Sequence, residues 1–180
     1  MSLVPVSAHP PSLAGPELAA RASALVLAAL GPVAIGAILA VHGSSPTPLV
    51  AVPAVVFGVV AATAPALYIA TATAGTAPSL AAVVRAFGIA LGAFGVALAG
   101  LLLPAAFLSL SSVSPSTTFV VATAALGGAG LLALRRLARE LDPRAMRPSL
   151  TSGVVFLVWS AATLGIAGRL WWDLAKEVMS

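Results

Sequence analysis

The most constraining feature of this 180-residue chain is a long stretch without any carboxylate. No aspartate or glutamate occurs between Glu17 and Glu140. Before Arg135, the only lysine or arginine residues in that stretch are Arg21 and Arg85. A water-soluble fold needs a solvated face, and about a quarter of the residues in soluble domains are charged. The sequence therefore predicts an all-α polytopic integral membrane protein, in which this stretch forms bilayer-spanning helices.

The composition agrees with a membrane chain and excludes several kinds of chemistry. Hydrophobic residues make up 60% of the chain and charged residues 8%, and the mean hydropathy is +1.09. The chain has no cysteine, so disulfides, thiolate metal sites and cysteine nucleophiles are excluded. Arginine greatly outnumbers lysine, and alanine, glycine and proline are abundant. This bias indicates a bacterium with a GC-rich genome.

The chain divides into about five apolar segments separated by short polar breaks. A helix of about 20 apolar residues crosses the hydrocarbon core of a bilayer. We expect a flexible N-terminal tail at 1–15, a membrane domain at 16–172 and a short C-terminal tail at 173–180. Within the membrane domain, the expected spans cover about 22–41, 49–71, 86–108, 119–135 and 152–171.

The ends of two expected helices carry recognisable signals. Ser79 is expected to cap the third helix, which begins at about Leu80. The fourth helix is expected to continue through its arginines toward Leu141, because Asp142 precedes a proline and such residues avoid the helical region. The fourth segment is short in strictly apolar residues. If it were re-entrant, the chain would have four spans and an internal C-terminus.

The distribution of basic residues predicts the orientation. With five spans, the N-terminus, the 72–85 loop and the 135–150 loop lie on one side of the membrane. That side carries Arg21, Arg85, Arg135, Arg136, Arg139, Arg144 and Arg147. The other side carries Arg169 and Lys176. By the positive-inside rule, we expect a protein of the bacterial cytoplasmic (inner) membrane with its N-terminus in the cytoplasm and its C-terminus outside. Trp171 and Trp172 would anchor the outer interface.

Small residues recur at helical spacing in the third and fourth spans. In the third span they are Gly88, Gly92, Gly95 and Ala99, and in the fourth they include Gly127 and Gly130. Small residues let helix backbones approach closely, which favours association inside a bilayer. Two uses are open: packing between helices of one chain, or contact with another membrane protein or with a second copy of the chain.

The basic residues near the cytoplasmic ends of the spans form the largest charged surface. They are Arg85, Arg135, Arg136, Arg139, Arg144 and Arg147. Such residues attract anionic lipid headgroups. A cytoplasmic partner protein is the alternative. Nucleic acid is not an expected partner, because no aromatic residues are interleaved with the charges.

No motif indicates a catalytic, cofactor or metal site. The sequence has no phosphate-binding loop, no H-E-x-x-H or G-x-S-x-G motif, and no pair of carboxylates at membrane depth. The two histidines, His9 and His42, do not lie on facing spans, so they do not predict haem or metal ligation. We therefore expect no enzymatic activity and no cofactor.

Two functional hypotheses follow. The first is a non-catalytic multi-pass protein that serves as a structural or accessory subunit and packs in a membrane complex through its glycine-rich helix faces. The alternative is a small oligomeric transporter or channel for a neutral or apolar solute. It rests on prolines within the second span and on a polar path formed there by Thr63, Tyr68, Thr71 and Thr73.

Overall fold

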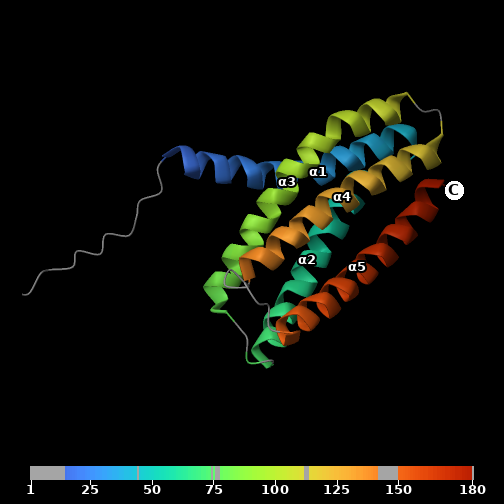
Figure 1. Cartoon of the computed structure of the whole chain (residues 1–180). Coiled ribbons are helices and arrows are strands. Elements are labelled where there is room, and N and C mark those ends of the chain that lie inside the picture. Colours follow the sequence, from blue (N-terminus) through green and yellow to red (C-terminus); the bar gives the residue numbers. More distant parts are fainter. Residues whose placement is uncertain are drawn as a thin grey trace, which may run out of the picture.

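The computed structural model describes residues 15–43, 45–73, 75, 78–111, 114–141 and 150–179. This part of the chain forms a bundle of five α-helices, without a strand (Figure 1). The helices are α1 (Gly15–His42), α2 (Pro48–Thr73), α3 (Leu80–Leu110), α4 (Pro115–Leu141) and α5 (Leu150–Met179). Each is long and apolar enough to cross a membrane. These helices confirm the all-α polytopic membrane fold.

The helix ends follow local chemistry. The Ser79 hydroxyl accepts a hydrogen bond from the Ala82 backbone N–H at 3.3 Å and caps α3, as predicted. The fourth helix is continuous and ends at Leu141, also as predicted. In contrast, α5 continues past the expected end of its span. In its last turns Leu174 and Ala175 are buried against the core, and Asp173 pairs with Arg169 and Lys176 along the same helix.

The helices form a ring in which the contact between α4 and α5 is the least extensive. The α3 helix packs extensively against both α4 and α1, α1 packs against α2, and α2 packs against α5. The contact between α5 and α4 that closes the ring is slight. The first half of α1, drawn in blue in Figure 1, extends beyond α3 and away from the other helices. The ring leaves room for a space between α5 and the rest of the bundle.

Glycine makes the contact of α1 with α3 unusually close. A β-carbon at Gly95 would meet the Ala24 carbonyl oxygen and the Ala28 backbone nitrogen, and it would lie 2.8 Å from the Ala28 Cα atom. At Gly92 an added β-carbon would lie 3.4 Å from the Ala24 β-carbon. Two of the glycines selected from the sequence therefore pack inside the chain, with α1 as their neighbour.

The contact of α1 with α2 depends on a glycine that the spacing argument did not select. A β-carbon at Gly36 would meet the Pro48 carbonyl oxygen and would lie 3.0 Å from the Leu49 Cα atom. Gly36, Pro48 and the neighbouring Ile35 are buried. The α1 helix therefore approaches both α3 and α2 closely, at two different glycines.

Candidate functional site: an apolar cavity beside α5

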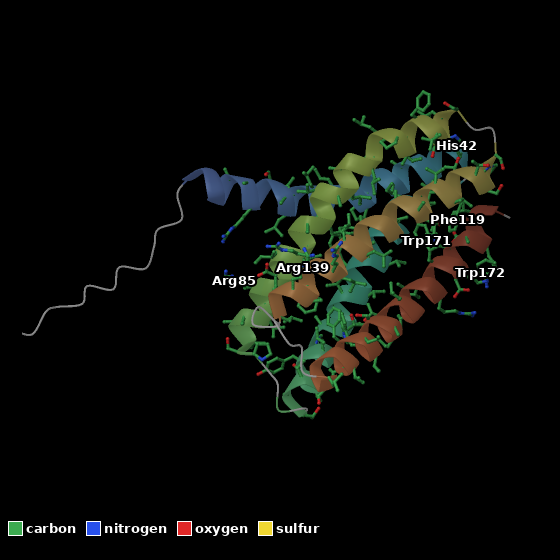
Figure 2. All side chains as sticks on the ribbon, viewed as in Figure 1. His42, Arg85, Phe119, Arg139, Trp171 and Trp172 are labelled. Atoms are coloured by element: carbon green, nitrogen blue, oxygen red, sulfur yellow. The ribbon has the colours of Figure 1, made fainter. Side chains whose placement is uncertain are left out.

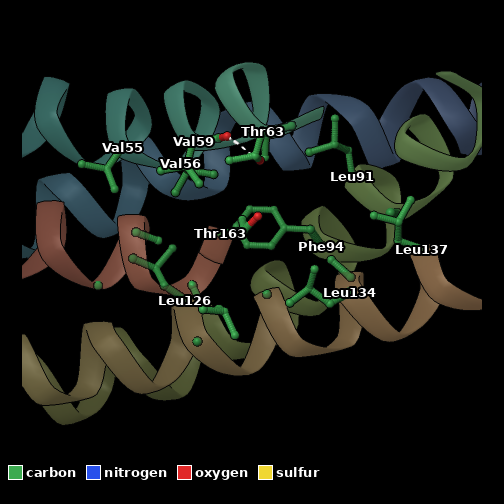
Figure 3. A pocket seen from close by; sticks show the side chains of 18 of the residues that line it. Val55, Val56, Val59, Thr63, Leu91, Phe94, Leu126, Leu134, Leu137 and Thr163 are labelled. Carbon is green, nitrogen blue, oxygen red and sulfur yellow. Dashed lines mark hydrogen bonds between the residues drawn. The ribbon is translucent and has the colours of Figure 1, made fainter. Parts of the chain in front are cut away.

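A cavity of about 400 Å³ lies among α2, α3, α4 and α5 (Figure 3). An apolar cavity of roughly 150 Å³ is already large enough to admit benzene. This space is therefore large enough for a substantial apolar molecule. The residues that line it are Val55, Val56, Val59, Val60, Thr63, Phe87, Ala90, Leu91, Phe94, Thr123, Leu126, Gly127, Gly130, Ala133, Leu134, Leu137, Trp159, Thr163, Leu164, Ala167, Gly168 and Trp171.

The cavity wall is almost entirely hydrocarbon and contains no charged side chain. Its few polar side chains are mostly hydrogen-bonded within the protein. The Thr63 hydroxyl donates to the Val59 carbonyl at 2.8 Å. The Thr123 hydroxyl donates to the Phe119 carbonyl at 2.7 Å, in the same helix. Such bonds satisfy the donor of a hydroxyl inside an apolar environment, so its hydrogen is not available to a ligand.

Thr163 is the exception among these hydroxyl groups. Its side chain projects from α5 into the cavity (Figure 3). Its oxygen is buried and has no hydrogen-bond partner. A buried hydroxyl without a partner destabilises a protein by about 1–3 kcal/mol relative to a paired one.

Two tryptophans on α5 mark the ends of the cavity. Trp159 and Trp171 are 12 residues apart in sequence, which corresponds to about 18 Å along a helix. The Trp159 indole N–H donates to the Thr63 carbonyl at 2.8 Å. The Trp171 indole N–H donates to the Thr123 hydroxyl, also at 2.8 Å. Each tryptophan therefore joins α5 to a different helix of the bundle, α2 at one end and α4 at the other.

Aromatic contacts close both ends of the cavity. At one end the Trp159 ring meets Phe87 edge-on, with ring centres 6.1 Å apart, and lies 5.7 Å from Phe156. At the other end Trp171 stacks on Phe119 with ring centres 4.9 Å apart. Aromatic pairs at these separations are attractive and fill space. These pairs place packed aromatic rings at both ends of the cavity along α5.

The side of the cavity between α4 and α5 is open instead. Gly127 on α4 and Gly168 on α5 line the cavity, and both are exposed. Leu164, another lining residue of α5, is 49% exposed. A β-carbon added at either glycine would have no neighbour within 4 Å. The cavity is therefore accessible from the side of the bundle, between α4 and α5.

The remaining small residues selected from the sequence divide between two environments. Gly130 lines the cavity together with Gly127. Gly88 on α3 would have no neighbour within 4 Å of an added β-carbon, and Ala99 is half-buried. The regular spacing along α3 therefore does not correspond to one continuous packed seam.

The hydroxyl groups expected to form a polar path do not line one together. Thr63 lies on the cavity wall, whereas Tyr68, Thr71 and Thr73 do not. The Thr71 hydroxyl donates to the Leu67 carbonyl at 3.0 Å, and the Thr73 hydroxyl donates to the Ala70 carbonyl at 3.0 Å. Both hydroxyls are therefore satisfied within α2.

Arg85 and Arg139 lie at one end of the bundle, and Trp171 and Trp172 lie toward the other (Figure 2). Arg85 and Arg139 are exposed at one end, as are Arg135 and Arg136, and Arg136 pairs with Glu140 at 2.7 Å. At the other end Trp172 is 57% exposed, whereas Trp171 faces Phe119 and Thr123. The remaining residues of the basic surface lie outside the described part of the chain: Arg144 and Arg147.

Trp159 is the main site residue that the sequence reasoning did not select. Tryptophan usually lies at the membrane interface, and its N–H needs a partner when it is buried. Trp159 is near the middle of α5, away from its tryptophan-rich end, and is 8% exposed. That isolated position in the sequence was the available signal for an inward-facing anchor.

The described residues contain no cluster that would suit a metal. Within 15–43, 45–73, 75, 78–111, 114–141 and 150–179, no group of three or more histidine, cysteine or acidic residues comes together. The His42 ring nitrogen Nδ1 is hydrogen-bonded to the Ile38 carbonyl of its own helix at 3.1 Å. His9 lies outside the described residues.

Comparison with known proteins yields no matching protein family, no similar curated protein and no similar solved structure. The chemistry of the cavity is therefore the basis for a functional proposal. Its defining features are an apolar wall, two closed aromatic ends and a lateral opening between α4 and α5.

Proposed function

We propose that this protein is a non-catalytic membrane protein that binds an uncharged, apolar molecule and acts as a small transporter for it. The observation that carries the proposal is the apolar cavity beside α5, which is closed at both ends and open at the side, between α4 and α5. An uncharged apolar molecule dissolves in the bilayer, so it reaches such an opening without crossing water. Of the two hypotheses drawn from the sequence, the cavity supports the transporter for an apolar solute.

The chemistry of the wall selects against charged ligands and against catalysis. Moving an unpaired charge into an apolar environment is strongly unfavourable, and no charged side chain lines this cavity to compensate it. Acid–base catalysis uses groups such as histidine, carboxylates, lysine or tyrosine. The polar side chains of the wall are threonine and tryptophan, so binding is better supported than reaction.

The accessory-subunit hypothesis receives less support from the packing. Residues of α1 fill the space beside Gly92 and Gly95, and Gly127 and Gly130 line the cavity. Gly92 and Gly95 are therefore not available as a surface for another protein, whereas Gly127 is exposed. The mass of the intact complex, purified in mild detergent, tests this hypothesis: a stable heteromer would support the subunit role, and a homo-oligomer would support an oligomeric transporter.

The proposal includes an orientation in the bacterial inner membrane, with the N-terminus in the cytoplasm and the C-terminus outside. The arginines at the end of the bundle that carries Arg85 and Arg139 support it. At the opposite end, Asp173 offsets the basic residues by pairing with Arg169 at 3.4 Å and with Lys176 at 2.7 Å. The arginine-rich end would attract anionic headgroups by about 1 kcal/mol per residue near the surface.

Single cysteines test this orientation, because the natural chain has none. Ser111 and Thr73 are exposed residues at opposite ends of the bundle. In intact cells, a membrane-impermeant thiol reagent is expected to label Ser111→Cys, whereas Thr73→Cys is labelled after lysis. The reverse pattern would contradict the proposed orientation.

A cavity-filling substitution tests the binding function. Gly130 lines the cavity and has room for a β-carbon, so Gly130→Leu places a side chain in the ligand space. Gly100 on α3 is exposed, also has room for a β-carbon, and is not part of the wall, so Gly100→Leu is a matched control. The reporter is quenching of Trp159 and Trp171 fluorescence by a dibrominated long-chain alkane, in a Trp172→Phe background. We expect at least about tenfold weaker quenching affinity for Gly130→Leu, which corresponds to about 1.4 kcal/mol.

The same assay gives a clear contrary outcome. If Gly130→Leu and Gly100→Leu both keep the affinity of the parent protein, the cavity does not bind the alkane and the proposed function is wrong. Uptake of a neutral apolar solute into proteoliposomes then measures transport, and it is expected to fall with Gly130→Leu and to be unchanged with Gly100→Leu.

A further inference from the structure

Thr163 behaves differently from other threonines in the described spans. Thr63, Thr71 and Thr123 each donate a hydrogen bond to the carbonyl four residues earlier, at 2.8, 3.0 and 2.7 Å respectively. This bond is the ordinary way to satisfy a hydroxyl inside a membrane helix. Thr163 lies in the middle of α5, yet its hydroxyl makes no such bond and has no partner.

The hydrogen-bond donors of the other polar side chains in the cavity wall already have partners within the protein. The Trp159 N–H is used by the Thr63 carbonyl, and the Trp171 N–H is used by the Thr123 hydroxyl. Among the described lining residues, Thr163 therefore provides the one side chain with an unused hydrogen-bond donor. It lies four residues from Trp159 and eight from Trp171, which corresponds to about 6 and 12 Å along α5.

A trapped water molecule is a poor partner for this hydroxyl. Buried waters typically make about three hydrogen bonds to polar groups around them. The wall near Thr163 is hydrocarbon, including Phe94 and Leu126, and its other side-chain donors are engaged. An oxygen atom of a bound apolar molecule meets the need of the hydroxyl without requiring further polar neighbours.

We propose that the ligand is a chain-like, uncharged lipid with a carbonyl or hydroxyl oxygen along its chain, and that Thr163 hydrogen-bonds this oxygen. The inference rests on the proposed function and specifies its ligand class. The chain occupies the space between the aromatic ends and enters between α4 and α5, where Gly127 and Gly168 leave the wall open. Thr163 is thus the residue that distinguishes an oxygen-bearing chain from a plain hydrocarbon.

The test compares two probes that differ in one group. A dibrominated long-chain ketone and a dibrominated alkane of equal chain length are added to the reconstituted full-length protein in a Trp172→Phe background. Affinity is measured by quenching of Trp159 and Trp171 and is expressed per mole fraction of probe in the bilayer, which removes differences in partitioning. We expect the ketone to bind about two- to tenfold more tightly than the alkane, as for one net hydrogen bond.

The variants identify the source of that preference. Thr163→Val replaces the hydroxyl by a methyl group of similar size, so it should abolish the preference for the ketone and keep the affinity for the alkane. The retained alkane affinity shows that the variant is folded. Ser160→Ala is the matched control, because Ser160 is another buried hydroxyl of α5 without a partner but does not line the cavity. It should keep the preference.

The outcomes separate the two proposals. If both probes bind equally well to the parent protein and Gly130→Leu weakens both, the inference about Thr163 is overturned and the proposed function stands. If Thr163→Val and Ser160→Ala reduce the ketone preference alike, Thr163 is not the recognising group. If Gly130→Leu changes the affinity of neither probe, the proposed function itself is overturned.

Discussion

The contact of α1 with α3 and the contact of α4 with α5 both contain glycine, yet they have opposite character. At Gly95 the backbone of Ala24 and Ala28 occupies the space that a β-carbon would need. At Gly127 and Gly168, nothing lies within 4 Å of an added β-carbon. Glycine brings two backbones together in the first region, whereas in the second it leaves an opening. The same residue type therefore serves packing in one half of the bundle and access in the other.

The difference extends to whole helices. Within the most apolar stretch of each helix, 33% of the residues are buried in α1 and 6% in α5. The α5 helix is joined to the bundle by the hydrogen bonds of Trp159 and Trp171 near the two ends of the cavity. Regions with few buried contacts open at lower free energy than well-packed regions. We infer that α1 and α3 contribute more to the stability of the bundle than α5 does, and that the proposed ligand would enter beside α5.

The largest expected effect of a single substitution is in the tight region. Gly95→Ala forces a β-carbon against the backbone of Ala24 and Ala28, which is not able to rotate away as a flexible side chain does. The free energy of unfolding in detergent should fall by about 2–3 kcal/mol. Chemical unfolding followed by circular dichroism measures this change. A Gly95→Ala variant as stable as the parent would show that α1 is not packed on α3 at this point.

The next effect tests the attachment of α5. Trp159→Phe retains an aromatic ring beside Phe87 but removes the N–H that donates to the Thr63 carbonyl at 2.8 Å. The free energy of unfolding should fall by about 1–2 kcal/mol, because a buried carbonyl loses its partner. Trp172→Phe is the control and should change it by less than about 0.5 kcal/mol, since Trp172 is exposed. Equal effects of the two variants would contradict this role of Trp159.

A smaller effect of opposite sign is expected in the loose region. Gly130→Ala adds a β-carbon where no atom lies within 4 Å and replaces a poor helix former by a good one. The free energy of unfolding should rise by about 0.5–1 kcal/mol, measured in the same way as for Gly95→Ala. Gly88→Ala on α3 has equal room and should behave alike. Loss of stability in Gly130→Ala would mean that the cavity wall is closed around this position.

The smallest effect is expected outside both regions. Arg136 pairs with Glu140 at 2.7 Å on the surface of α4, and its side chain is 49% exposed. Arg136→Gln should lower the free energy of unfolding by about 0.3–0.5 kcal/mol at low salt. The difference from the parent should disappear at high salt, because exposed charges are screened. A large effect that persists in salt would assign Arg136 a packing role.

Several details of the site show where sequence reasoning succeeds and where it stops. The N-cap at Ser79 and the end of α4 at Leu141 were predictable, because each depends on a few neighbouring residues. Gly95 was selected as a packing residue by its spacing, but the same spacing selected Gly88, which has no neighbour. Trp159 was not selected, because its partner Thr63 lies on a different helix, 96 positions away in the sequence.

By itself, the sequence determined that this chain is an all-α membrane protein with five apolar helices, since the absence of carboxylates between Glu17 and Glu140 leaves no solvated face. The hydrophobic requirement of the bilayer acts on each segment alone, so composition and length are sufficient. The tertiary structure alone decided which glycines touch a neighbour, which threonine lacks a partner, and that α5 stands beside a cavity. These features depend on distances between helices. The apolar faces of the five helices are similar in composition, so composition does not specify which two faces pack together.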